Sequence, residues 1–207
     1  MGKPSPMIFI VDDDPSVRKG LKRLVKSAGL RAEVSASAEE FLQSEPYDGP
    51  CCLILDVCMP GQGGIDLQKE LAEKGFSLPV IFITGHGNIP MGVQAMKDGA
   101  VDFLPKPFDE EDLLSAIDRA IEKDIRIRKD RSEKKEIQHR IDALTSREYD
   151  VLRWVITGML NKQIASKMAI TEKTVKVHRG RVMQKMRVVS VAELVRLAEK
   201  AGITPAR

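Results

Sequence analysis

The chain has 207 residues, of which 43% are hydrophobic and 30% charged, and a net charge of +3, so it has room for one large domain or two small ones. No stretch approaches the roughly 18 to 20 consecutive apolar residues of a membrane span, and residues 1–14 lack the apolar segment of a signal peptide. Cys51, Cys52 and Cys58 show neither metal-ligand nor redox spacing, so we expect reduced thiols and a cytoplasmic protein without membrane contact.

Short apolar runs alternate with helix-periodic segments in the first part of the chain. The runs that predict strands cover 7–11, 51–57, 78–84 and 100–104, with 31–35 as a weaker fifth. Runs so rich in Val, Ile and Leu indicate strands covered on both faces, and their alternation with helices indicates a parallel sheet. We therefore predict an α/β domain with a doubly wound, five-stranded parallel sheet.

The first strand runs into three consecutive carboxylates, Asp12, Asp13 and Asp14, which repel one another unless solvent, protonation or a bound cation relieves the repulsion. Asp14 precedes Pro15, and this pair is typical of a helix start, with Asp as the cap and Pro in the first turn. Asp12 and Asp13 therefore remain as two carboxylates at the end of a strand.

Chemically useful side chains also end the later strands, with Asp56 after the third, Thr84 after the fourth and Lys106 after the fifth. Because functional groups of an open parallel sheet gather at the carboxyl ends of its strands, we expect these residues to meet Asp12 and Asp13. Three carboxylates suit Mg²⁺, and Asp56 beside that cation and Lys106 could attack phosphorus while the Thr84 hydroxyl bonds the transferred group. Each residue alone has an ordinary structural explanation, but the combination predicts phosphoryl transfer.

A long helical pattern begins near Asp109, and its later half carries dense alternating charge with only isolated isoleucines. This pattern predicts a first domain at 5–122 and a charged, helical linker at 123–140. A short coiled-coil seam is the alternative for the linker, although few apolar heptad positions support it.

Four short helical patterns without a strand follow the linker, and they predict a small all-α domain at 141–207. Thr145 with Glu148, and Ser190 with Glu193, match the capping-box pattern of a helix start. Residues 1–138 contain 19 Lys and Arg against 24 Asp and Glu, a net charge of −5, and residues 139–207 contain 14 against 6, a net charge of +8. The basic C-terminal part suggests a nucleic-acid contact, although a solvated basic surface is also common.

The basic residues concentrate in the segment TEKTVKVHRGRVMQKM. Val175, His178, Val182 and Met186 form one helical stripe there, which we expect to face the core. No acid lies between Lys173 and Arg187, and the cations of this stretch are Lys173, Lys176, Arg179, Arg181, Lys185 and Arg187. The preceding segment NKQIASKMAI predicts a shorter helix joined by a tight turn, so the pair indicates a helix-turn-helix that binds DNA.

Residues of about 7 to 125 resemble the receiver domain of response regulators, which has the flavodoxin-like or CheY-like fold with strand order 2-1-3-4-5. The resemblance extends to the segment MPGQGGIDL after Asp56 and to the pair Lys106-Pro107, for which it implies a cis bond. It implies that Asp56 accepts phosphate from a partner histidine kinase. It also implies a switch pair, Thr84 and Phe103, that responds to the phosphate.

The same resemblance implies a Mg²⁺ site. Asp13, Asp56 and the backbone carbonyl of Cys58 would bind the cation directly, with Asp12 acting mainly through water. The Cys58 side chain is no obstacle, because that position contributes its backbone.

Residues of about 143 to 201 resemble the LuxR-type effector domain of FixJ-like regulators, through LTSRE, NKQIA and TVKVHR. The resemblance implies a recognition helix in the major groove, with Lys176 and Val177 facing bases. Gly180 lies on the same face without a side chain, which gives more weight to Arg179 and Arg181 as contacts to the DNA backbone. The remaining candidate DNA contacts are Asn161, Lys162, Lys173, Thr174 and Lys185.

Together these features predict a phosphorylation-controlled transcriptional regulator of a two-component system, and no enzyme beyond phosphoryl transfer onto its own Asp56. Phosphorylation would favour a homodimer through the fourth helix and fifth strand, near Val93, Ala95, Met96 and Val101, and would promote binding to promoter DNA and RNA polymerase. The alternatives are a constitutive DNA-binding regulator with a silent receiver and a phosphorelay protein whose output is not DNA binding.

Overall fold

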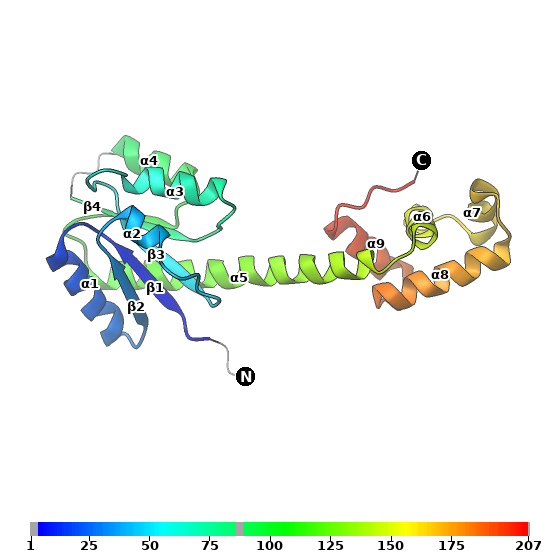
Figure 1. Ribbon diagram of the computed structural model, residues 1–207, viewed down its shortest axis with the longest axis horizontal. Helices are drawn as coiled ribbons and strands as arrows, with labels where there is room; N and C mark the ends of the chain where they lie inside the picture. Colours follow the sequence, from blue (N-terminus) through cyan, green and yellow to red (C-terminus); the bar gives the residue numbers. More distant parts are fainter. Residues whose placement is uncertain (1–3, 86–88, 207) are drawn as a thin grey trace. The chain divides into compact units, whose positions relative to one another are not determined.

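The computed structural model describes residues 4–85 and 89–206, and it divides the chain into two compact units, Met1–Arg128 and Lys129–Arg207 (Figure 1). The first unit contains β1 (Met7–Val11), α1 (Pro15–Ser27), β2 (Arg31–Ser35), α2 (Ala38–Leu42), β3 (Cys51–Asp56), α3 (Gly64–Glu73), β4 (Val80–Thr84), α4 (Ile89–Lys97), β5 (Asp102–Pro105) and the first part of α5 (Glu110–Asp142). Among the helices in the described part of the chain, none is both long and apolar enough to cross a membrane.

All five strands are parallel, and their order in the sheet is β2-β1-β3-β4-β5, which confirms the predicted α/β fold. Successive side chains of a strand point to opposite faces, so β1, β3 and β4 supply two separate cores. Phe9, Leu55 and Phe82 pack with α2, α3 and α4, whereas Ile10 and Ile54 pack with α1 and α5. Because helices cover both faces, the central strands are apolar at nearly every position.

The strand β2 gives the weakest sequence pattern because it forms one edge of the sheet. Arg31 and Glu33 are exposed there, and Ala32 and Val34 are only half-buried. Charged side chains are common on edge strands, where they discourage pairing with other chains. The edge position therefore explains why this strand resembles a buried strand so little.

The turn from β3 into α3 brings two backbone segments unusually close. The N–H of Gly64 donates to the carbonyl of Val57 at 3.0 Å, and a Cβ atom placed on Gly64 would lie 2.2 Å from the backbone oxygen of Asp56. No real side chain tolerates such a contact with backbone, so only glycine fits at the first position of α3. Gly64 thereby allows α3 to begin directly beside the end of β3.

The helix α5 runs through residues 123–140, the segment predicted to be a charged helical linker, and the boundary between the two units falls within it, between Arg128 and Lys129. In the first unit, the buried carboxylate of Asp124 accepts hydrogen bonds from the N–H of Cys51 at 2.9 Å and from Nε of Arg128 at 2.7 Å. In the second unit, Ile137 is buried in the core. The segment thus makes packing contacts within each unit that its charged sequence does not predict.

The second unit contains the last part of α5 and four helices, α6 (Ser146–Val155), α7 (Asn161–Met168), α8 (Glu172–Met186) and α9 (Val191–Lys200). Its core includes Val175, Val182 and Met186, so these members of the predicted stripe are confirmed as core residues, and His178 is half-buried. The side chain of Ser190 caps α9 by accepting from the N–H of Glu193 at 3.2 Å. These contacts confirm the predicted all-α domain.

A buried acid links the start of α6 to α8. Glu148 is only 2% exposed, and its carboxylate accepts from the N–H of Thr145 at 2.9 Å and from Nζ of Lys185 at 2.6 Å. The hydroxyl of Thr145 accepts in turn from the N–H of Glu148, which completes the predicted capping box. The Lys185 ammonium and the Thr145 N–H lower the pKa of Glu148 below its ordinary value.

The close approach at Gly64 predicts a large effect of one added methyl group. We expect Gly64→Ala to lower the free energy of unfolding of the first unit by about 2 kcal/mol or more, because the backbone of Asp56 must move. The matched control is Gly20→Ala, at an exposed position of α1, where a Cβ meets nothing within 4 Å and alanine should stabilise by about 0.5 to 1 kcal/mol. Hydrogen exchange of β3 peptides measures both effects, and equal protection in both variants would contradict the prediction.

The lowered pKa of Glu148 predicts a stability change that depends on pH. A carboxylate with a lowered folded pKa stabilises the fold above its unfolded pKa, and this contribution is lost as the pH falls through the folded pKa. We expect Glu148→Gln to cost about 1 kcal/mol at pH 7, and the difference from the wild type to shrink below about pH 4. Denaturant unfolding followed by the fluorescence of Trp154, the single tryptophan, reports on this unit. The control is Glu172→Gln, at an exposed acid of α8. If the stability cost of Glu148→Gln were independent of pH, it would result from packing rather than from the charge of Glu148.

Candidate functional site

The acidic loop after β1 gives each of its three carboxylates a different environment. Asp12 is fully buried, whereas Asp13 and Asp14 are exposed. Asp14 caps α1, because its Oδ1 accepts from the N–H of Ser16 at 2.7 Å and from that of Val17 at 3.4 Å, and the Ser16 bond lowers its pKa. The predicted helix start is thus confirmed, and Asp14 is engaged in capping.

Asp12, Asp13 and Asp56 meet at the carboxyl edge of the sheet, as predicted. Each can offer a carboxylate oxygen within 4.8 Å of those of the other two. The register of the sheet pairs Val11 with Leu55, so the next residue along each chain segment, Asp12 or Asp56, lies level with the other. Parallel pairing, rather than proximity in sequence, brings these acids together.

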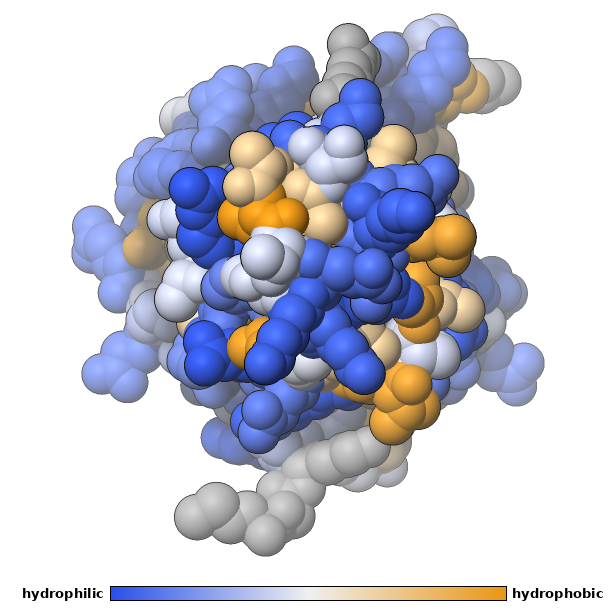
Figure 2. Space-filling model, turned by 90° about the vertical axis from the view of Figure 1, so that its right-hand side faces the viewer, coloured by the Kyte–Doolittle hydropathy of each residue, from blue (hydrophilic) through white to orange (hydrophobic). Residues whose placement is uncertain are grey.

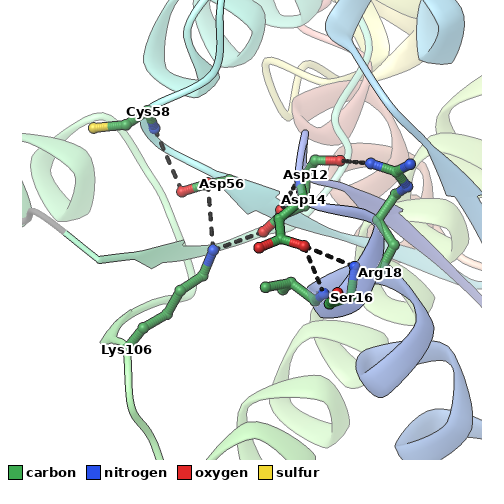
Figure 3. Close-up of polar contacts among 8 residues, drawn as sticks. Asp12, Asp14, Ser16, Arg18, Asp56, Cys58 and Lys106 are labelled. Carbon is green, nitrogen blue, oxygen red and sulfur yellow. Dashed lines mark hydrogen bonds and ion pairs between the residues drawn. The ribbon is translucent and has the colours of Figure 1, made fainter.

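Lys106 places its ammonium group between two of these acids (Figure 3). Its Nζ lies 2.7 Å from Oδ2 of Asp12 and 3.3 Å from Oδ2 of Asp56. Burial opposes the charge on Lys106, but the hydrogen bond and charge of Asp12, together with Asp56, hold its pKa above the ordinary value. The ammonium therefore remains positively charged and partly neutralises the cluster.

Burial raises the pKa of Asp56, and the neighbouring Asp12 carboxylate raises it further, although the Lys106 ammonium opposes the shift. The cluster contains three carboxylates and one ammonium, so it retains an excess of negative charge. Oxygen ligands in such a group favour a hard divalent cation, which relieves the repulsion among them. The donor set therefore fits Mg²⁺.

The remaining predicted receiver residues lie around this cluster. Cys58 is exposed, and its N–H donates to Oδ1 of Asp56 at 3.4 Å. Thr84 is buried at the end of β4, where its carbonyl accepts from the N–H of Lys106 at 2.7 Å. The bond between Lys106 and Pro107 is cis, as expected.

Phe103 is half-buried on β5, away from the ends of the strands. Its ring packs against that of Phe82 with centroids 6.4 Å apart. On α4, a Cβ atom at Gly92 would lie 3.2 Å from the Phe103 ring, so the ring lies directly against that helix. Phe103 thus connects the strand that carries Lys106 to α4.

Only part of the candidate surface on α4 and β5 is exposed. Val93 and Met96 are 49% and 46% exposed, respectively, one helical turn apart. Ala95 is fully buried, and Val101 is half-buried and packs against the core on the α5 side. The exposed apolar part of this surface is therefore carried by α4.

The helix α8 presents its polar face opposite the buried stripe. The exposed candidates on this face are Lys173, Lys176, Val177, Gly180 and Arg181. A Cβ atom on Gly180 would meet nothing within 4 Å, so the backbone there is open. The side of the molecule that lies on the right in Figure 1 is mainly hydrophilic, with small separate apolar patches (Figure 2).

Three further DNA-contact candidates make hydrogen bonds inside the unit. Nη1 of Arg179 donates to Oδ1 of Asn161 at 2.9 Å and so ties α8 to the first residue of α7, beside exposed Lys162. The hydroxyl of Thr174 lies 2.8 Å from that of Thr171, which caps α8. The bond between Arg179 and Asn161 thus links the two helices of the predicted helix-turn-helix, and the contact between Thr174 and Thr171 lies at the start of α8.

Lys185, a predicted contact to the DNA backbone, makes ion-pair and hydrogen-bond contacts within the unit. Its ammonium pairs with the buried Glu148 and also donates to the carbonyl of Ala143 at 2.9 Å, so it braces the fold. Sequence spacing places Lys185 among the helix cations but does not reveal a partner 37 positions away. Gly64 was also not identified as a site residue, although the pair Gly63-Gly64 shortly after the Asp56 strand was an available signal.

Comparisons with known proteins cover both units. Residues 8–118 match the response regulator receiver domain, and residues 142–198 match the bacterial regulatory proteins of the luxR family. The chain is 46% identical to nodulation protein W of Bradyrhizobium diazoefficiens, over 96% of this chain and 87% of that protein. It is 40% identical to the transcriptional regulatory protein FixJ of Rhizobium meliloti, over 96% of this chain and 97% of that protein.

Solved structures agree with these relatives. The response regulator StyR matches with a TM-score of 0.85 and 46% identity, over 95% of this chain and 100% of that chain. Full-length FixJ from B. japonicum matches with a TM-score of 0.58 and 38% identity, over 98% of this chain and 99% of that chain. The chain therefore belongs to the response regulators of two-component systems, in which a receiver domain controls a LuxR-type DNA-binding domain, and it is a phosphorylation-controlled transcription regulator.

Proposed function

We propose that Asp56 is the residue that accepts the phosphoryl group from a partner histidine kinase. The supporting observation is the difference between the two carboxylates that share Lys106. Asp12 is fully buried, and its oxygens accept bonds of 2.9 Å from the N–H of Asp14 and 2.7 Å from Lys106. The hydrogen bonds that Asp56 accepts are longer, at 3.3 Å from Lys106 and 3.4 Å from the N–H of Cys58, and Asp56 is 7% exposed to solvent. Asp56 is thus the less restrained nucleophile.

In the transfer, an oxygen of Asp56 forms a bond to phosphorus while the bond from phosphorus to the donor's leaving group breaks. The Lys106 ammonium, already in contact with Asp56, stabilises the charge on an oxygen of the transferred group. The Thr84 hydroxyl bonds another such oxygen. Because the product stays attached to Asp56, the chain undergoes transfer onto itself and is no enzyme for external substrates.

Asp13, Asp56 and the backbone carbonyl of Cys58 would hold Mg²⁺, with Asp12 acting through water. The short bonds that already occupy both oxygens of Asp12 agree with this indirect role. When bound, Mg²⁺ would supply positive charge to the phosphoryl oxygens.

The signal then passes from Thr84 and Phe103 to the surface of α4. Movement of the Thr84 hydroxyl toward the phosphate leaves space that the Phe103 ring fills, and the ring already touches α4 at Gly92. This change favours a receiver homodimer through α4 and β5, in which Val93 and Met96 become covered. Two DNA-binding domains brought together in this way read two half-sites of a promoter, and RNA polymerase is the next partner in the cytoplasm.

In the DNA-binding domain, we propose Lys176 and Val177 as base contacts, and the exposed cations of α8 as phosphate contacts. Lys173 and Arg181 are exposed, and Arg179 is held in place by Asn161. Lys162 and Thr174 complete the set of phosphate contacts. Lys185 is not included, because its ammonium is occupied by Glu148.

The role of Asp56 predicts a single covalent adduct. Incubation of the wild type with acetyl phosphate and Mg²⁺ should add one phosphoryl group, which intact-mass spectrometry detects, and omission of Mg²⁺ should nearly abolish it. Asp56→Asn should show no adduct because it removes the nucleophile, whereas Asp118→Asn, at an exposed acid of α5, should react like the wild type. An adduct on Asp56→Asn would refute the assignment. So would a wild type that remains unmodified by both acetyl phosphate and its partner kinase.

The arrangement of α8 predicts that Lys176 and Arg181 contribute to DNA binding, whereas Lys185 contributes to the stability of the fold. Lys176→Ala and Arg181→Ala should each weaken binding to duplex DNA. Arg181→Ala, at a proposed phosphate contact, should also reduce the slope of log affinity against log salt by about 1. Lys185→Ala should leave the salt slope unchanged but lower the stability of the unit, because it leaves Glu148 unpaired. Fluorescence anisotropy at several salt concentrations gives the slopes. Unchanged DNA affinity for both Lys176→Ala and Arg181→Ala, with an unchanged slope for Arg181→Ala, would contradict the proposed interface.

A further inference from the structure

The side chain of Arg18 reaches back from α1 to the acidic loop (Figure 3). Its Nη1 donates to the backbone carbonyl of Asp12 at 2.6 Å, across six positions of the chain. Arg18 is half-buried, and its guanidinium is bonded to backbone rather than to a carboxylate. This contact is the tightest of those that hold the loop, and the phosphoryl-transfer chemistry does not require it.

Hydrogen bonds hold both residues that flank Asp13 in the chain, Asp12 and Asp14. The N–H of Asp14 donates to Oδ1 of Asp12 at 2.9 Å, and the carbonyl of Asp14 accepts from the N–H of Arg18 at 3.0 Å. Arg18 therefore bonds both residues that flank Asp13, one through its side chain and one through its backbone. In the part of the chain that the structure describes, the Asp13 side chain itself has no hydrogen-bond partner.

We propose that Arg18 is a positioning residue for the Mg²⁺ site. By fixing the peptide between Asp12 and Asp13, it holds the exposed carboxylate of Asp13 toward Asp56. This inference rests on the proposed function, because it assumes that Asp13 and Asp56 bind the same cation. Mg²⁺ requires near-ideal octahedral geometry, so a ligand on a loosely held loop binds it poorly.

Positioning and charge predict opposite effects for the removal of Arg18. The guanidinium is positive, so if its charge dominated, its removal would strengthen the binding of a divalent cation to the acidic cluster. Loss of the bond to the Asp12 carbonyl would instead loosen Asp13 and weaken binding. We expect positioning to dominate, because solvent screens the charge of a half-exposed side chain, whereas partners that orient metal ligands change affinity by about 10- to 100-fold.

The test is isothermal titration calorimetry of Mg²⁺ into the full chain. Calorimetry is suitable because the single tryptophan, Trp154, lies in the other unit and does not report on this site. Arg18→Met keeps a similar stem but removes the donors, and should bind Mg²⁺ about tenfold or more weakly than the wild type. Arg18→Lys, which retains the charge and one donor group, should bind Mg²⁺ with an affinity between those of the wild type and Arg18→Met.

The matched control is Arg23→Met, which removes an exposed cation of the same helix. It should leave the Mg²⁺ affinity within about twofold of the wild type, because an exposed charge is screened. Circular dichroism confirms that each variant is folded, and Arg18→Lys provides a second variant if Arg18→Met does not fold. Mg²⁺ affinity in the Arg18 variants that equals or exceeds that of Arg23→Met would overturn the inference.

A second readout separates this inference from the proposed function. At saturating Mg²⁺, Arg18→Met should recover the adduct yield of the wild type with acetyl phosphate, because its defect lies in assembling the site. A wild type that binds Mg²⁺ and forms the adduct, together with an unaffected Arg18→Met, refutes only the positioning role. A wild type that neither binds Mg²⁺ nor forms an adduct refutes the proposed function and this inference with it.

Discussion

The ammonium of Lys106 makes the acidic edge of the receiver possible. Asp12 is fully buried and Asp56 almost so, with oxygens within 4.8 Å of each other, which would be costly without a nearby cation. Lys106 contacts both carboxylates and offsets part of their repulsion. Its single positive charge compensates only one of the three carboxylates, so the edge retains an excess of negative charge and still favours a divalent cation.

The sheet supplies this edge because its interior is otherwise fully used for packing. Helices cover both faces of the central strands, and side chains such as Ile54 and Leu55 are completely buried. Only the carboxyl ends of the strands remain open for polar chemistry. The in-line register of β1 and β3, and the bond between the Thr84 carbonyl and the Lys106 N–H, then place the reactive groups at one level. Gly64 allows α3 to start close beside Asp56 without displacing it.

The DNA-binding domain uses its charges in two ways. One cation of α8, Lys185, compensates a buried carboxylate and thereby fixes α8 against the start of α6. The other cations of this segment lack such partners in the described structure, apart from Arg179, which bonds Asn161, and Arg187, which pairs with Glu136 at 3.4 Å. This division resembles that of the receiver, where Asp14 caps a helix and Asp13 remains exposed. In both domains, some charges of a cluster stabilise the fold and the others are left for ligands.

Local patterns are enough to predict much of this protein. Helix caps such as Asp14 and Thr145 depend on residues within three positions, and the buried stripe of α8 depends on helical periodicity, so both are readable from neighbours in the chain. The meeting of Asp12, Asp56 and Lys106 was also predictable, because parallel strands align their carboxyl ends. Tertiary packing alone decides that Lys185 pairs with Glu148, that Ala95 is core while Met96 is exposed, and that the boundary between the two units falls after Arg128, within the continuous helix α5. Such outcomes depend on partners tens of residues away, and a charged or apolar side chain looks the same in sequence whether its neighbour is protein or water.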